Sequence, residues 1–204
     1  MTHKPSWTIR FFASCLLSLL LNGCGARQPI SYYNLTPRTS EQQRPVATET
    51  HAPPLAIGIG PVELPDALGR AQIAARIDPG RLKYNDSQRW SGSLAENFAA
   101  VLLEDIATLL PEQATVASFP WGSYFQPTHR LVANVSRFDG SLGDEVVLTA
   151  RWTITNPSGK ETILSRKSTI QVKVTGNEYH DLVTAQSQAL ADLSNEISAA
   201  LIGQ

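Results

Sequence analysis

Cys24 is the residue whose surroundings most clearly indicate chemistry, because a cysteine thiol can react as a nucleophile once it is deprotonated. The first ten residues include His3, Lys4 and Arg10 and contain no acidic residue. An uncharged, mostly apolar run of eleven residues follows, Phe11–Leu21. As a helix, this run would rise only about 16 Å, whereas the hydrocarbon core of a bilayer is about 30 Å thick. The run is therefore too short to span a membrane, and the pattern predicts a secretory signal.

The tetrapeptide Leu21-Asn22-Gly23-Cys24 resembles the lipobox of bacterial lipoproteins, although Asn22 occupies a position that more often holds Ala, Ser or Thr. The resemblance implies acylation of the Cys24 thiol, cleavage just before it, and anchoring in a membrane through N-terminal acyl chains. Two or three chains anchor a protein firmly, since each buried methylene contributes about 0.8 kcal/mol. The alternative is an ordinary signal with a cysteine near its cleavage site by chance.

The residue after Cys24 bears on the choice of membrane. Gly25 stands where an Asp would favour retention in the inner membrane. We therefore expect the protein on the periplasmic face of the bacterial outer membrane, with the inner membrane as the less favoured location.

The rest of the chain offers little for catalysis. The remaining histidines are His51, His129 and His180, and no two have the spacing of metal ligands on one element. No Gly-x-Ser-x-Gly sequence indicates a serine nucleophile. Glu104 and Asp105 are neighbours on a predicted helix and point about 100° apart, so we interpret them as a solvated helix face. We expect no enzymatic activity, no metal and no cofactor.

Charge and cysteine content limit the partners. Cleavage before Cys24 would remove Lys4 and Arg10 and leave 15 basic against 18 acidic residues. This balance argues against nucleic acid as a partner and against electrostatic adhesion to anionic lipid. Cys15 would leave with the signal, and an acylated Cys24 would leave no thiol pair for an internal disulfide. Packing alone must then stabilise the domain.

The sequence predicts three parts: a signal at 1–23, an acylated N-terminus with a flexible, proline-rich tether at 24–54, and one globular domain at 55–204. Four prolines lie between Thr36 and Pro54, with almost no large apolar residue. Residues 30–35 form a strand-like patch that we expect to dock on the sheet of the domain.

Apolar residues with a period of two predict the strands. They lie at residues 55–60, 73–77, 81–84, 115–119, 129–138, 146–155 and 170–175. Gly58 and Gly60 fall in the first of these, and no helix follows them as a dinucleotide-binding fingerprint would require.

Two helices are predicted beside these strands. One begins after Ser93, with capping-box spacing to Glu96, and stops at Pro111. A long C-terminal helix begins near Asn177. Its apolar stripe either faces the sheet or pairs two protomers. The expected fold is α/β of the α+β kind, a mostly antiparallel sheet packed on one face by helices.

Aromatic residues are the best candidates for a binding surface. Trp152 shares a face with Leu148 and is expected in the core. Trp121, Tyr124 and Phe125 occur in a predicted loop. If they are exposed together, they form a candidate contact for a partner protein or for lipid. Core packing is the alternative for each of them.

Several short segments occur in an order that is similar to that of the ABC-type transport auxiliary lipoprotein family. After the lipobox these are Tyr32-Tyr33-Asn34-Leu35, Pro61-Val62-Glu63-Leu64-Pro65, Arg89-Trp90, Leu102-Leu103-Glu104-Asp105, Phe119-Pro120-Trp121, Arg137-Phe138-Asp139, Ala150-Arg151-Trp152 and the C-terminal helix around Leu182–Leu190. The likeness extends over nearly the whole chain that follows the signal.

The resemblance implies a non-catalytic subunit of an MCE-type lipid transport system that supports membrane integrity. Its expected partners are an MCE-domain protein and an inner-membrane permease, and the resemblance allows a homo-oligomeric ring. A lipid-binding carrier or chaperone is the first alternative. A hydrolase of envelope components is the second.

Overall fold

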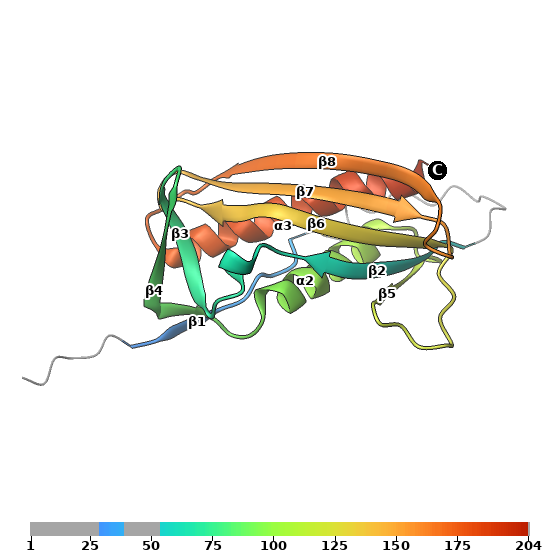
Figure 1. The fold of residues 1–204 in the computed structure, drawn as a ribbon, viewed down its shortest axis with the longest axis horizontal. Helices are drawn as coiled ribbons and strands as arrows, with labels where there is room; N and C mark the ends of the chain where they lie inside the picture. The colour runs from blue at the N-terminus through green and yellow to red at the C-terminus, as the bar shows by residue number, and fades with distance from the viewer. Residues whose placement is uncertain (1–28, 39–53, 204) are drawn as a thin grey trace, which may run out of the picture.

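The computed structural model describes residues 29–38 and 54–203, which form an eight-stranded mixed sheet and two long helices (Figure 1). The elements, in chain order, are β1 (Ser31–Tyr33), β2 (Ala56–Glu63), the short 3-10 helix η3 (Asp66–Leu68), β3 (Gln72–Asp78), β4 (Arg81–Trp90), α2 (Leu94–Leu109), β5 (Thr115–Ser118), β6 (His129–Gly140), β7 (Glu145–Thr155), β8 (Thr162–Lys173) and α3 (Tyr179–Ile202). The α+β class and the long C-terminal helix are confirmed.

Strand β6 is the centre of the sheet. On one side it pairs antiparallel with β7, which pairs antiparallel with β8. On the other side, two groups of strands pair with different parts of β6. The parallel pair β2–β5 lies along its first half, from His129 to Asn134. The β3–β4 hairpin and β1 join at its end, where Ala75 lies opposite Gly140. The three longest strands, β6, β7 and β8, pair antiparallel. The sheet is mixed because β1–β4, β2–β5, β2–β6 and β3–β6 are parallel pairs.

Both helices lie on the same side of the sheet (Figure 1) and contact each other. Helix α3 packs on β6, β7 and β8, and α2 packs on β2 and β5. The predicted stripe of α3 faces inward, and Leu190, Leu193 and Ile197 are fully buried. Each such side chain contributes about 1.5–3 kcal/mol when removed from water. The stripe is therefore part of the domain core.

The strand with the clearest alternation in the sequence, β7, is two-sided over its central residues. Leu148, Ala150 and Trp152 on β7 are buried beneath the helices, and Arg151 between them is exposed. The indole Nε1–H of Trp152 donates to Ser168 Oγ on β8 at 2.9 Å. The prediction that Trp152 lies in the core is confirmed.

The helix starts agree with the sequence to within a residue. The Ser93 hydroxyl accepts from the backbone N–H of Glu96 at 3.3 Å, as the capping-box spacing predicted. Helix α3 is capped by Glu178 instead of Asn177, because Glu178 and Asp181 form a reciprocal capping box. Among the described residues, no helix is both long enough and apolar enough to cross a bilayer.

The segment before residue 39 packs against the body. Strand β1 pairs with β4, and the side chain of Leu35 is buried. The predicted docking of this patch is confirmed. Residues 39–53 lie outside the described residues, so the tether and the division of the chain at residue 54 stay predictions.

This segment also corrects the interpretation of Asp105. Glu104 is exposed, as a solvated helix face requires, but Asp105 is fully buried. Its Oδ1 accepts the backbone N–H of Arg38 at 3.2 Å. The interpretation was wrong for Asp105 because the chain at Arg38, far away in the sequence, contacts this face of α2.

An ion pair fastens the β3–β4 hairpin to β6. Arg76 donates from Nε and Nη2 to the two carboxylate oxygens of Asp139, at 2.6 and 2.7 Å. Arg137 donates to the same carboxylate at 3.2 Å. Burial alone would raise the pKa of Asp139, but the hydrogen bonds and charges of Arg76 and Arg137 outweigh burial and lower the pKa below its ordinary value.

Candidate partner-binding site

The first described residues, which follow the predicted anchor in the sequence, lie at one end of the sheet (Figure 1). Cys24 is outside the described residues, and its acylation stays a prediction. It stands five positions before Pro29, the first described residue, and a chain extends at most about 3.6 Å per residue. Pro29 leads directly into β1 (Figure 1). An acylated Cys24 would therefore keep this end of the domain within about 18 Å of the membrane.

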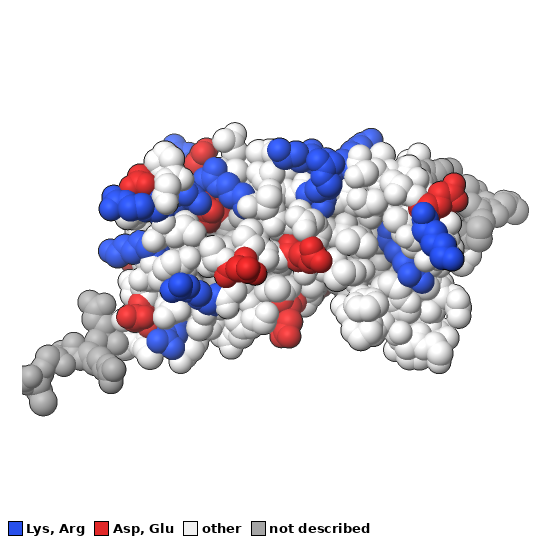
Figure 2. All heavy atoms as spheres, in the orientation of Figure 1, with Lys and Arg blue, Asp and Glu red and all other residues white. Residues whose placement is uncertain are grey.

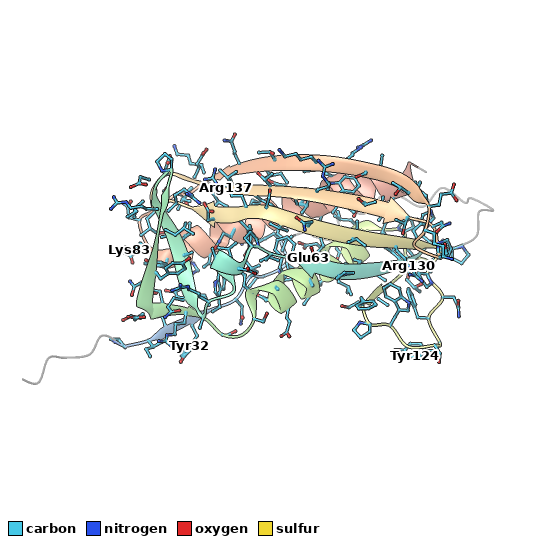
Figure 3. All side chains as sticks on the ribbon, in the orientation of Figure 1. Tyr32, Glu63, Lys83, Tyr124, Arg130 and Arg137 are labelled. Carbon is cyan, nitrogen blue, oxygen red and sulfur yellow. The ribbon has the colours of Figure 1, made fainter. Side chains whose placement is uncertain are left out.

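The aromatic loop, residues 119–125, lies between β5 and β6 at the other end of the sheet (Figures 1 and 3). Its base is fixed to β2 by backbone hydrogen bonds. Phe119 N–H donates to Ile59 O at 2.8 Å, and Thr128 N–H donates to Ala56 O at 2.7 Å. In Figure 2 the loop forms a lobe at lower right that carries no charged side chain.

Trp121 is the packing centre of this loop. Its ring lies edge-on to Phe119 and Phe125, with centroids 5.5 and 6.2 Å apart. The guanidinium of Arg130 lies 5.4 Å from the centre of the Trp121 ring, within cation–π range. On β2, a Cβ added at Gly58 would lie only 2.8 Å from the Trp121 ring. Glycine at position 58 therefore allows the indole to lie directly on the strand.

The structure divides the three predicted contact residues. Trp121 and Phe125 are half-buried, whereas 91% of Tyr124 is exposed. Phe119, which was not among the predicted contact residues, is 54% exposed. Its position just after a strand and just before a proline was the signal that could have identified it. Phe119 and Tyr124 thus present the aromatic surface, and Trp121 and Phe125 support it.

The aromatic loop and the first described residues lie at opposite ends of the domain (Figure 1). The loop precedes His129 at the start of β6, and the β3–β4–β1 group joins β6 at Gly140. Eleven strand steps of about 3.3 Å separate these positions by roughly 35 Å. Figure 3 shows Tyr32, which is close in sequence to the first described residues, and Tyr124 at opposite ends of the domain.

A groove of about 750 Å³ lies between the aromatic loop and the outer face of α2, and we call it the α2 groove. Strand β5 ends at Ser118, opposite Ile59, whereas β2 continues to Glu63. The groove lies where β5 would otherwise continue. Pro61 and Val62 line it from β2, and Phe119 lines it from the aromatic loop.

The described candidates for catalysis lie on separate elements. His129 begins β6, His180 lies in the first turn of α3, and His51 is outside the described residues. The His129 Nδ1 atom lies 3.0 Å from Thr128 Oγ1, and burial lowers the pKa of His129. In residues 29–38 and 54–203, no group of three His, Cys, Asp or Glu side chains could hold a metal ion.

Comparisons with known proteins identify the class. Residues 33–198 match the family described as the ABC-type transport auxiliary lipoprotein component. A crystal structure of an uncharacterized protein superposes with a TM-score of 0.68 at 20% identity, over 85% of this chain and 99% of that one. A Xanthomonas campestris protein of the family DUF330 superposes with a TM-score of 0.64 at 16% identity, over 82% and 92%. No curated protein matches the sequence.

The chain therefore belongs to the ABC-type transport auxiliary lipoprotein component family, as its segments predicted. The two superposed structures confirm the fold. Family membership makes the chain an accessory to a transporter and indicates a lipid-anchored protein of the cell envelope.

Proposed function

We propose that the chain is a non-catalytic auxiliary subunit of an MCE-type envelope lipid transport system that supports membrane integrity. Acyl chains on Cys24 hold it on the periplasmic face of the outer membrane. The family match over residues 33–198 carries the proposal. The partners are an MCE-domain protein and the inner-membrane permease of the same system.

The aromatic loop and the first described residues lie at opposite ends of the domain, and this placement supports a partner protein, and not lipid, as the ligand of the loop. The first described residues lie at the anchor end, roughly 35 Å from the loop along β6. With Cys24 in the membrane, the aromatic loop is at the end of the domain distal to the anchor. Exposed aromatic residues on a packed support are common anchors of protein interfaces.

The interior gives no support to the alternative of a lipid carrier. A carrier needs an apolar cavity between the sheet and the helices. In the described structure this layer contains the large side chains of Phe98, Phe138 and Trp152, all fully buried. Phe98 on α2 and Phe138 on β6 pack edge to face with centroids 5.2 Å apart. The layer is filled by the side chains of the protein itself.

Photo-crosslinking in living cells tests the proposal. Benzoylphenylalanine in place of Tyr124 should crosslink to the MCE-domain protein or the permease. The same probe in place of Thr169, exposed on the outer face of β8, is the matched control and should not. Capture of neither transport protein from Tyr124, with both expressed, would contradict the proposed contact.

A genetic experiment tests the transport role separately. Deletion of the gene should sensitise cells to detergent, and the wild-type gene should restore resistance. Complementation by Cys24→Ala should fail, because a chain without acyl groups is not held at the membrane. Normal resistance in the deletion strain would contradict the role in membrane integrity.

A further inference from the structure

Helix α2 has two apolar faces, and the described residues bury only one of them. Phe98, Leu102 and Ile106 point into the core and are fully buried. A second row, Ala95, Ala99, Leu103 and Ala107, recurs every four residues and lines the α2 groove. All four side chains of this row remain partly or fully exposed.

The geometry of this row suits a helix. Residues four apart form one ridge along a helix, and such ridges interlock with those of a second helix. Three of the four side chains are methyl groups, so a second helix can approach to about 8 Å between axes. From Ala95 to Ala107 the row rises about 18 Å, which corresponds to three to four turns of a partner.

The charges along the groove are of one sign. Glu96 and Glu104, both on α2 and both exposed, are the charged residues that line it. They are two turns apart, about 12 Å along the axis. Neither carboxylate forms an ion pair with a Lys or Arg among the described residues. Basic side chains at the edge of a ligand that covers the apolar row are therefore complementary in charge to the groove.

The aromatic loop forms the third wall of the α2 groove, beside α2 and β2, and supplies an aromatic contact. Phe119 lines the groove and is 54% exposed. The edge-on contact with Trp121 holds its ring in place. A side chain that is exposed and already ordered can anchor a ligand at a low cost in conformational entropy.

We propose that the α2 groove binds an amphipathic helix of a partner protein. The apolar stripe of that helix packs on Ala95, Ala99, Leu103 and Ala107, and its Lys or Arg side chains pair with Glu96 and Glu104. The proposal rests on the proposed function in one respect: it names the kind of segment by which a subunit of the transport system attaches.

The test uses the full-length protein in its own cells, with benzoylphenylalanine in place of Ala99. Mass spectrometry identifies the captured peptide. The expected product is a segment of a partner with an apolar period of about 3.6 residues and flanking Lys or Arg. Glu104→Lys should then lower the crosslinking yield about tenfold by reversing one of the two rim charges. Glu161→Lys makes the same charge change in the β7–β8 turn and should leave the yield unchanged.

Several results would overturn the proposal. They are capture of a second copy of this chain, capture of lipid, capture of a segment without basic residues, no capture at Ala99, or a yield unaffected by Glu104→Lys. Failure of the groove is distinct from failure of the transport role. Capture of the MCE-domain protein at Tyr124 but not at Ala99 would refute the groove alone. Capture of a basic amphipathic helix from a protein outside the transport system would support the groove and refute the transport assignment.

Discussion

Substitution of Gly58 by alanine tests whether the aromatic loop is supported by direct contact with β2. The new Cβ would lie 2.8 Å from Cη2 and Cζ3 of Trp121, and 3.2 Å from Cε3. Carbon atoms in contact are normally about 3.5–4.0 Å apart. The indole must therefore shift by about 1 Å, and its contacts with Phe119, Phe125 and Arg130 are disturbed together.

The free energy of unfolding should fall. Overpacking destabilises a protein by roughly 1–3 kcal/mol. Alanine lowers the entropy of the unfolded chain, which stabilises the folded state by about 0.4–1 kcal/mol. We expect a net loss of about 1–2 kcal/mol, which lowers the Tm by about 4 °C for a domain of this size. Urea unfolding of the full-length protein measures the change, and the Trp121 indole resonance reports the shift of the ring.

Gly92→Ala is the matched control. No heavy atom lies within 4 Å of the Cβ that this substitution adds, so stability should stay the same or rise slightly. In a Trp121→Ala background the cost of Gly58→Ala should disappear, because the atoms that clash are gone. If Gly58→Ala proves as stable as Gly92→Ala and leaves the indole resonance unmoved, the proposed support of the loop is wrong.

The remaining predictions concern the ion pair at Asp139 and the buried stripe of α3. Asp139→Asn removes the carboxylate that holds Arg76 and should lower the free energy of unfolding by about 3 kcal/mol, as measured by urea unfolding. Because the pKa of Asp139 is lowered in the folded state, its contribution is present above about pH 4 and is lost as the pH falls through the folded pKa. Wild-type stability should therefore decline more steeply than that of Asp139→Asn below about pH 4, and parallel curves would contradict the ion pair. Leu190→Asp places an unpaired charge in the core and should cost several kcal/mol or prevent folding, whereas an unchanged Tm would show that the α3 stripe is exposed.

Much of the fold could be predicted because its signals are local. The alternation from Leu148 to Ile154 defines β7, and Ser93 and Pro111 bound α2. The branching of the sheet at β6 could not be predicted in this way. It depends on the pairing of both β2 and β3 with β6, which joins segments far apart in the sequence. It also depends on a bulge between Ile59 and Val62 that the alternation does not reveal.

The candidate site shows the same division between local and distant causes. That residues 119–125 form an aromatic loop could be predicted from composition and prolines. That Trp121 is half-buried depends on Gly58, sixty-three residues earlier, and on Arg130 from the next strand. The burial of Asp105 likewise depends on the segment that ends at Arg38. The four-residue spacing of Ala95, Ala99, Leu103 and Ala107 can be read in the sequence, but its exposure follows from where β5 ends.

The most direct test of a lipid-anchored subunit is the mass of its N-terminal peptide. The protein should be extracted from outer-membrane fractions, digested, and the peptide that begins at residue 24 analysed by mass spectrometry. We predict a peptide starting at Cys24 that carries a thioether-linked diacylglycerol, with or without an acyl chain on the amine. A free thiol at Cys24, or a chain that retains residues 1–23, would contradict the anchor and the orientation of the aromatic loop that depends on it.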